Sequence, residues 1–450
     1  MSAPEPVDLL IRGGVVLTVD PQNREFEGDV AVRDGTIVAL GPALDVRAEH
    51  TVEARGGAVM PGFVNAHMHE CLERGWFEDL PFMRWLEDYA LPKDRAYEPR
   101  HMHGAALLNQ LEMIRGGTTS FIDIFRFPGE AAAVAERSGL RATFSPQIID
   151  EPEGVGESFE SNLAFVESWH DRVPDRIRTW FGPHSLYSCH EATYTRIREM
   201  ADRFEVGIHT HLAESRDEVA IVAERTGGLT PAEYLDRLVG LGPDVACAHG
   251  IQLTDDDVKL VAERGAGVAH CPTSNMKLGN GVARVPDLLA VGATVGLGTD
   301  SVMTNNNLDM FEEMRQAALL QKLALADATV LPCREVLRMA TMGSARVLGL
   351  DRQVGSLEVG KAADLIVVGL GRAHTWPVFR EGGGNVAEQV VYACSGADVR
   401  TTVVDGRVLM EDGVVRSLDE REVEEVVHRE ARHLMVKAGV EDAILRKASS

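Results

Sequence analysis

Apolar and polar positions follow one pattern at the two ends of the chain and another in its middle. The first sixty residues form short β-branched and apolar runs separated by glycine-containing turns, and the same texture returns near the other end. These runs predict β-strands, and we expect them to form one small β-sandwich domain from residues 1–58 and 358–415. Residues 416–450 are charged with a helical period, which predicts a C-terminal helical segment.

Between these ends, short apolar runs alternate with longer stretches of helical period. This alternation is typical of βα units around a parallel sheet. Eight units match a (β/α)8 TIM barrel, which takes about 250 residues, and we place that barrel at residues 59–357 of an α/β fold. The eight predicted strands are VMPGFVNAHMH, TTSFIDI, RATFSPQII, IRTWFGPH, VGIHTHL, VACAHGI, GVAHCP and TVGLGTD.

Polar side chains end most of these predicted strands. In a barrel of this kind the carboxyl-terminal strand ends carry the chemistry. A single histidine there is more often a hydrogen-bonded core residue than a ligand, but a set at successive strand ends indicates a shared site. The set is His67 and His69, His184, His211 with Glu214 after it, His249, His270 and Asp300.

Four members of the set form a candidate metal site. His67 and His69 are two positions apart, so both side chains can leave one face of an extended strand. With His211 and Asp300 they provide imidazole and carboxylate ligands, which suit zinc or ferrous iron. The pattern does not separate these two metals. His209 shares a strand face with His211 but lies farther from the strand end, so we expect it deeper in the barrel.

Glu214 is the candidate proton shuttle, because a carboxylate just past a strand end could reach a metal-activated water. A first-turn helix glutamate favoured by the helix dipole is the alternative interpretation. His249 could hydrogen-bond the same water, whereas His270 could equally be a packing residue. The two histidines of residues 101–103 lie at a predicted helix start and point in different directions, so we expect them at the surface.

Composition narrows the classes of partner. The chain has 450 residues, of which 45% are hydrophobic and 25% charged, as in an average soluble protein. A formal net charge of −24 argues against a nucleic acid or an anionic membrane as partner. No apolar run approaches the roughly 20 residues of a membrane span, and we see no signal peptide. Six scattered cysteines without a CxxC pair favour a cytoplasmic protein.

Several motifs resemble the amidohydrolase superfamily over nearly the whole chain. These are PGFVNAHMH (61–69), HLAE (211–214) and GTD (298–300). Three more are similar to the S-adenosylhomocysteine/methylthioadenosine deaminase branch, which neighbours the triazine hydrolases and guanine deaminases. They are GPHS (182–185), SNMKLGNG (274–281) and NNLDMF (306–311).

The resemblance implies a role for each candidate residue. It implies that His67, His69, His211 and Asp300 bind one divalent metal, that Glu214 shuttles protons, that His249 and Asp300 position hydroxide, and that His184 touches the substrate. Relatives with two metals bridge them through a carboxylated lysine on the fourth strand. Lys93 is the only lysine between His69 and His211 and precedes the second predicted strand, so we expect a single ion, zinc before iron.

The leading hypothesis is hydrolytic deamination of an amino-substituted N-heterocycle, with release of ammonia. The substrate would be a purine, a pterin, a pyrimidine or an adenosine-derived nucleoside. A triazine-type hydrolase that expels chloride or an alkylamine is the alternative, and a catalytically inactive scaffold is a third possibility. We expect a small heterocyclic molecule as the partner and a homo-oligomer as the assembly.

The loop after the first predicted strand is the candidate substrate-selecting segment. A flat heterocycle could bury one face against its apolar cluster, although the cluster could instead pack the loop onto the barrel. The cluster comprises Trp76, Phe77, Leu80, Phe82 and Trp85.

Lys93 lies in the same loop, where deaminases of this branch usually carry an acidic residue that grips the ribose. An arginine expected after the third strand is replaced by Pro146 or Gln147. A cation cannot accept hydrogen bonds from ribose hydroxyls. Lys93 therefore predicts weak activity on adenosine, methylthioadenosine and S-adenosylhomocysteine, and better activity on a smaller or anionic heterocycle.

Overall fold

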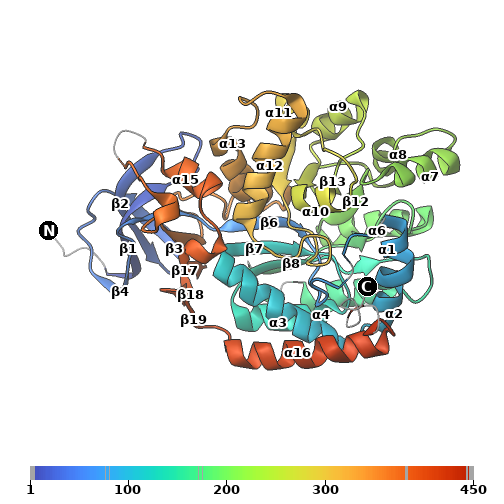
Figure 1. Cartoon of the computed structure of the whole chain (residues 1–450), viewed down its shortest axis with the longest axis horizontal. Coiled ribbons are helices and arrows are strands. Elements are labelled where there is room, and N and C mark those ends of the chain that lie inside the picture. Colours follow the sequence, from blue (N-terminus) through green and yellow to red (C-terminus); the bar gives the residue numbers. More distant parts are fainter. Residues whose placement is uncertain are drawn as a thin grey trace.

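A nine-stranded sheet at one end of the molecule is built from both ends of the chain (Figure 1). The computed structural model describes residues 6–76, 78–80, 82–170, 172–174, 176–380, 384–441 and 444. Antiparallel pairing of β5 (Gly57–Pro61) with β16 (Leu365–Gly369) joins the two halves of this sheet. Its other strands are β1 (Val7–Leu17), β2 (Glu25–Arg33), β3 (Thr36–Gly41), β4 (Ala48–Glu53), β17 (Val399–Val404), β18 (Arg407–Glu411) and β19 (Val414–Val415).

Parallel strands from the middle of the chain form three smaller sheets, ordered β10-β8-β7-β6, β11-β9 and β12-β13-β14-β15. Backbone hydrogen bonds link them: His209 N–H donates to Phe181 O over 2.8 Å, and Asp300 N–H donates to His67 O over 3.0 Å. Each of the eight predicted strand regions contains at least one observed strand. The strands are β6 (Phe63–Met68), β7 (Thr118–Asp123), β8 (Arg141–Phe144), β9 (Gln147–Ile148), β10 (Ile177–Thr179), β11 (Gly182–Pro183), β12 (Ile208–Leu212), β13 (Val245–His249), β14 (Gly267–His270) and β15 (Thr294–Leu297).

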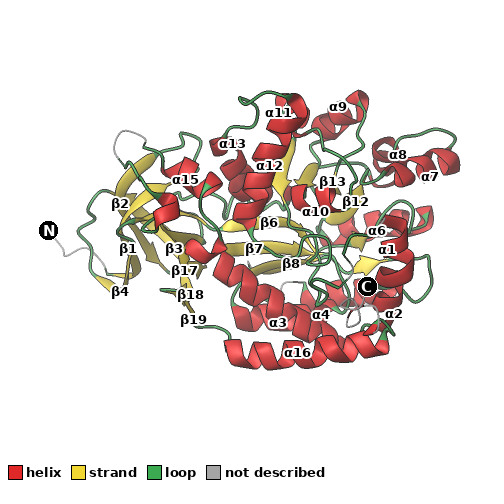
Figure 2. Cartoon of the chain, viewed as in Figure 1, coloured by secondary structure: helices red, strands yellow, loops and turns green. Residues whose placement is uncertain are grey.

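Helices flank the parallel strands, and α16 (Glu420–Lys437) lies alongside α3 (Pro99–Gly116) (Figures 1 and 2). No helix among the described residues is long and apolar enough to cross a membrane. The other α-helices are α1 (Phe82–Trp85), α2 (Leu91–Ala96), α4 (Pro128–Ser138), α5 (Phe159–Trp169), α6 (Glu191–Phe204), α7 (Arg216–Thr226), α8 (Pro231–Val239), α9 (Asp255–Arg264), α10 (Pro272–Lys277), α11 (Val285–Ala290), α12 (Met310–Leu325), α13 (Cys333–Arg338), α14 (Ser344–Val347) and α15 (Val386–Tyr392). Short helical turns of other types are η1 (Leu86–Ala90), η2 (Met339–Gly343), η3 (Ala373–Thr375) and η4 (Gly396–Asp398).

The first predicted strand is two strands, which meet at Gly62. Residues before it pair within the nine-stranded sheet, and residues after it run parallel to β7. A Cβ atom at Gly62 would lie 2.1 Å from Cγ2 of Thr119, closer than any side chain can pack. Glycine therefore allows the chain to pass directly from one sheet to the other, and this passage sets the direction of the strand that carries His67.

His101 is buried, so the expectation that it lies at the surface was wrong. Glu98 N–H donates to His101 Nδ1 over 2.9 Å at the start of α3, and His101 Nε2 lies 2.7 Å from His433 Nδ1 on α16. Because Nδ1 accepts a backbone N–H, the ring proton is on Nε2 and donates to His433. Although Glu98, His101 and His433 come close enough to hold an ion, this proton makes the group a helix-docking contact.

Candidate metal centre and active site

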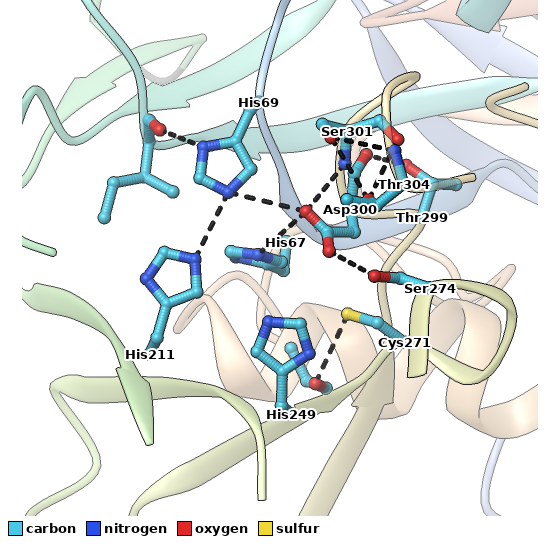
Figure 3. Close-up of polar contacts among 12 residues, drawn as sticks. His67, His69, His211, His249, Cys271, Ser274, Thr299, Asp300, Ser301 and Thr304 are labelled. Carbon is cyan, nitrogen blue, oxygen red and sulfur yellow. Dashed lines mark hydrogen bonds and ion pairs between the residues drawn. The ribbon is translucent and has the colours of Figure 1, made fainter. Parts of the chain in front are cut away.

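Five of the predicted residues meet at the carboxyl-terminal ends of parallel strands (Figure 3). His67 belongs to β6, and His69 follows the last residue of that strand. His211 lies in β12 and His249 ends β13, while Asp300 follows β15. Because parallel strands end at one edge, four separate stretches of sequence deliver these side chains to one point.

The imidazole and carboxylate atoms of this group lie within a few ångströms of one another. His69 Nε2 lies 3.2 Å from His211 Nε2 and 3.5 Å from Asp300 Oδ1. His67 Nε2 lies 3.6 Å from the same Asp300 oxygen. This spacing brings nitrogen and oxygen donors around a common centre.

Backbone carbonyls fix the protonation of two of these histidines. His69 Nδ1 lies 2.5 Å from Ile124 O, and His211 Nδ1 lies 2.7 Å from His184 O. A carbonyl only accepts, so each Nδ1 carries the proton and donates it. Both Nε2 atoms are left with a lone pair that points at the centre, which is the tautomer of a metal-ligating histidine.

A relay of three groups fixes His67 in the same way. Ser145 O–H donates to Asp123 O over 2.9 Å, so Ser145 Oγ accepts from His209 Nδ1–H, also at 2.9 Å. His209 Nε2 is then the acceptor for His67 Nδ1–H at 2.9 Å. His209 thus lies deeper than His211, as the sequence predicts, and orients His67.

The donor set fits a divalent metal ion. His67 Nε2 is buried and has no hydrogen-bond partner among the described residues, and its lone pair faces the other donors. Asp300 accepts from Ser274 Oγ–H over 2.6 Å and from Ser301 N–H over 2.7 Å. Both carboxylate oxygens therefore act as acceptors, Oδ2 for Ser274 and Oδ1 for Ser301. Asp300 is therefore an ionised ligand candidate.

Glu214 and His249 lie beside this centre. Glu214 Oε1 accepts from Asn280 Nδ2–H over 3.1 Å and lies 3.9 Å from His249 Nε2. His249 Nδ1–H donates to Asn275 Oδ1 over 3.0 Å, which turns its Nε2 toward Glu214. Burial raises the pKa of Glu214. For His249, burial works in the other direction, but the Glu214 and Asp300 carboxylates outweigh it and raise the pKa.

Residue-level reasoning on the sequence missed three supporting side chains. Ser274, Asn275 and Asn280 contact Asp300, His249 and Glu214, respectively. All three belong to the segment SNMKLGNG (274–281), which contributed to the family resemblance without an assigned role. The segment begins within α10, and one short stretch thus supports three candidate catalytic groups.

A cavity of about 270 Å³ opens onto these groups. His184, Trp85 and Lys93, three of the predicted substrate-binding residues, line it. Trp76 is not among its described lining residues and packs against the main hydrophobic core. Of the remaining cluster, Leu80 packs against the core, whereas Phe77 and the side chain of Phe82 lie outside the described residues.

The charge of Lys93 is balanced inside the fold. Its side chain is buried, and Nζ lies 3.6 Å from Glu73 Oε1 and 5.1–5.2 Å from the ring centres of Phe125 and Tyr97. The sequence-based expectation of a positive charge beside the substrate took no account of Glu73, which lies next to Lys93 in the fold. The Lys93–Glu73 pair is neutral overall.

Comparisons with known proteins agree on one family. The model of the Amidohydrolase family matches residues 58–409. The 5′-deoxyadenosine deaminase of Methanosarcina mazei is 39% identical over 96% of this chain and 99% of its own. The 5-methylthioadenosine/S-adenosylhomocysteine deaminase of Syntrophobacter fumaroxidans is 40% identical over 94% and 98%. A crystal structure of an adenosine deaminase from Xanthomonas campestris with bound zinc superposes with a TM-score of 0.91, at 35% identity over 96% and 100%.

Replacing His209 with alanine should weaken metal retention about 10–100-fold, the usual effect of losing a ligand's supporting partner. The reason is that His67 Nδ1–H loses its acceptor, so the ring can rotate or change tautomer. Competition with a chelator measures the change. His270→Ala is the matched control, because His270 is equally buried but lies outside the described ligand groups. Equal retention in the two variants would contradict the relay.

Proposed function

The chain belongs to the amidohydrolase family, and from this premise we propose that it hydrolyses the ring amino group of an adenosine-derived nucleoside and releases ammonia. One observation carries the proposal: three of the four ligand candidates line one cavity together with Glu214 and His249, and the fourth, His67, lies within reach of the same ligand atoms. The names of two relatives, a 5′-deoxyadenosine deaminase and a methylthioadenosine/S-adenosylhomocysteine deaminase, support the substrate class. The wider prediction of an N-heterocycle aminohydrolase contains this narrower one.

We infer that the parallel strands close into a (β/α)8 barrel at residues 59–357. Supporting this are the hydrogen bonds from β12 to residue 181 and from residue 300 to β6. The nine-stranded sheet would be the core of a β-sandwich domain from residues 1–58 and 358–415, with 416–450 as a C-terminal helical segment. We further infer that the protein is cytoplasmic and forms a homo-oligomer. Its six cysteines are free and buried, which suits a reducing compartment.

We propose that one divalent ion, zinc in preference to iron, is held by His67, His69, His211 and Asp300. The support is the neutral tautomer of each histidine and the ionised state of Asp300. When bound, the ion supplies Lewis acidity that makes water nucleophilic near neutral pH. No lysine belongs to the described lining near these residues except Lys93, which pairs with Glu73, so a second, lysine-bridged ion has no support.

Glu214 performs the proton transfers in this proposal. It accepts a proton from the attacking water and returns it to a ring nitrogen, while the hydroxyl group adds to the carbon that bears NH₂. Its raised pKa suits both directions of transfer near neutral pH. Asp300 and His249 orient the attacking oxygen. Asp300 then accepts the proton of the new hydroxyl group and passes it to the amino group, so the C–N bond breaks, ammonia leaves and the ring carbon becomes a carbonyl.

The cavity walls determine how the substrate lies. We propose that His184 contacts the heterocycle and that Trp85 covers one of its faces; both line the cavity. Lys93 and Asp94 line its wall, and Glu151 lines it with a largely exposed side chain. Trp76 was predicted to bind substrate, but it is not among the described residues that line the cavity, so this role has no support from the cavity.

Replacing Glu214 with glutamine should preserve the fold and the metal but reduce turnover roughly 10²–10⁴-fold, since the amide cannot carry the proton. Ammonia release from methylthioadenosine or 5′-deoxyadenosine measures this loss. Glu224→Gln, at an exposed position of α7, controls for the same chemical change in the helix that follows Glu214. Wild-type turnover by Glu214→Gln would contradict the mechanism. Chloride release from a chlorotriazine without ammonia release from either nucleoside would favour the triazine-hydrolase alternative.

Nucleosides with an uncharged 5′ group should be better substrates than S-adenosylhomocysteine. Lys93 is the one lysine or arginine in the described cavity lining. Because Glu73 offsets it, no cation is left to pair with the amino-acid carboxylate, and an unpaired buried charge is costly. We expect kcat/KM for methylthioadenosine to exceed that for S-adenosylhomocysteine by about tenfold or more, equivalent to roughly 1.4 kcal/mol.

Glu151→Lys would place a cation at the cavity and should narrow this difference. Steady-state kinetics on both nucleosides, with wild type and variant, test it. Equal kcat/KM values in the wild type would show that the charge of the cavity does not select the 5′ group.

A further inference from the structure

Glu218 is a buried carboxylate in the first turn of α7, where it contacts the backbone of Glu214. Its Oε2 accepts from Glu214 N–H over 2.8 Å, and its Oε1 accepts from Ala213 N–H over 3.1 Å. The side chain is 1% exposed, and burial raises its pKa to about 7. An acid at this helix position commonly returns to the N-cap residue. Here Ser215 is the N-cap, and the carboxylate reaches the two residues before it.

These two residues form a turn in an unfavourable backbone conformation. Ala213 has φ 51°, in the left-handed region that residues with a Cβ seldom adopt. Its carbonyl accepts from Ile251 N–H over 3.0 Å and Gln252 N–H over 2.8 Å. Both sides of this residue are therefore held, the N–H side by Glu218. If the turn relaxed toward a right-handed conformation, the Glu214 side chain would leave its place beside His249.

We propose that Glu218 is a positioning residue, whose carboxylate holds the left-handed turn at Ala213 and so aims Glu214 at the reacting atoms. The assignment rests on the proposed function, in which Glu214 transfers the protons. It assigns Glu218 a role in geometry and not in proton transfer, because among the described residues its carboxylate accepts hydrogen bonds from the backbone N–H groups of Ala213 and Glu214 alone.

An ordinary helix cap is the competing explanation, and α9 provides a matched example of one. Asp257 occupies the same helix position and is also 1% exposed. It accepts from Thr254 N–H over 2.9 Å, while Thr254 Oγ1 accepts from Asp257 N–H over 3.1 Å. Asp257→Asn thus removes a buried capping carboxylate of comparable position without touching Glu214.

The test is Glu218→Gln in the metal-loaded enzyme. The amide oxygen can accept one of the two N–H groups, but its NH₂ faces the other donor, so the turn loses a partner. We expect kcat to fall about 10–100-fold, as a misplacement of about 1 Å can cause, with metal content unchanged and KM within about threefold. Amide hydrogen exchange at residues 213 and 214 should accelerate. Asp257→Asn should leave kcat and this exchange unchanged.

A second variant separates the turn from other effects of the substitution. Glycine adopts a left-handed φ without a Cβ penalty, so Ala213→Gly combined with Glu218→Gln should recover at least about fivefold of the lost kcat. Ala213→Gly alone should stay within about threefold of wild type. If Glu218→Gln alone does not fold, the double variant is measured in its place, because glycine at position 213 removes the conformational cost of the left-handed turn.

The assignment is overturned if Glu218→Gln keeps wild-type kcat and exchange, if Asp257→Asn loses as much kcat, or if Ala213→Gly gives no recovery. It is also overturned if neither variant containing Glu218→Gln folds, which would make Glu218 a folding determinant. Glu214→Gln measured in parallel separates the two claims. Normal turnover by Glu214→Gln would refute the proposed function, whereas its inactivity beside a fully active Glu218→Gln would refute only the assignment of Glu218.

Discussion

The candidate centre depends on hydrogen bonds that hold the Nδ1–H groups of three histidines. Two of these groups donate to backbone carbonyls, and that of His67 donates to His209. Each bond fixes both the ring and its proton, so three Nε2 lone pairs face a common centre, with Asp300 beside those of His67 and His69. Such an arrangement of donors is repulsive without a cation and favourable with one. The fold therefore prepares the centre before any ligand arrives, because the acceptors belong to strands and their immediate extensions.

The same strand ends carry strained backbone. Ala213, His249 and Asp300 have positive φ angles between 51° and 73°, at a cost of order 1–3 kcal/mol each. These turns bring side chains back over the strand ends instead of letting them continue into solvent. Around them, Ser274, Asn275 and Asn280 of one segment hydrogen-bond three different candidate catalytic groups. Precision at the site thus depends on neutral side chains and backbone groups as much as on charged residues.

The sequence predicted the parts that follow from periodicity, and it missed those that depend on three-dimensional neighbours. The eight strand regions followed from alternation, the convergence of five residues at their ends followed from the barrel that alternation predicts, and the family resemblance is confirmed. The break at Gly62 was hidden because one apolar run feeds two sheets. His101 was misplaced because its partner on α16 is more than 300 positions away. Lys93 was considered only as a positive charge beside the substrate, because its pairing with Glu73 is visible only in the fold. The ligand and catalytic roles themselves stay predictions.

The most direct test of the account is a crystal structure of the zinc-loaded protein, with anomalous scattering recorded at the zinc edge. The account predicts one anomalous peak per chain, within about 2.0–2.2 Å of a nitrogen atom of His67, His69 and His211 and of a carboxylate oxygen of Asp300. Two peaks in the cavity, a peak at Glu98 and His433 instead, or a ring of His67 turned away from His209 would contradict it.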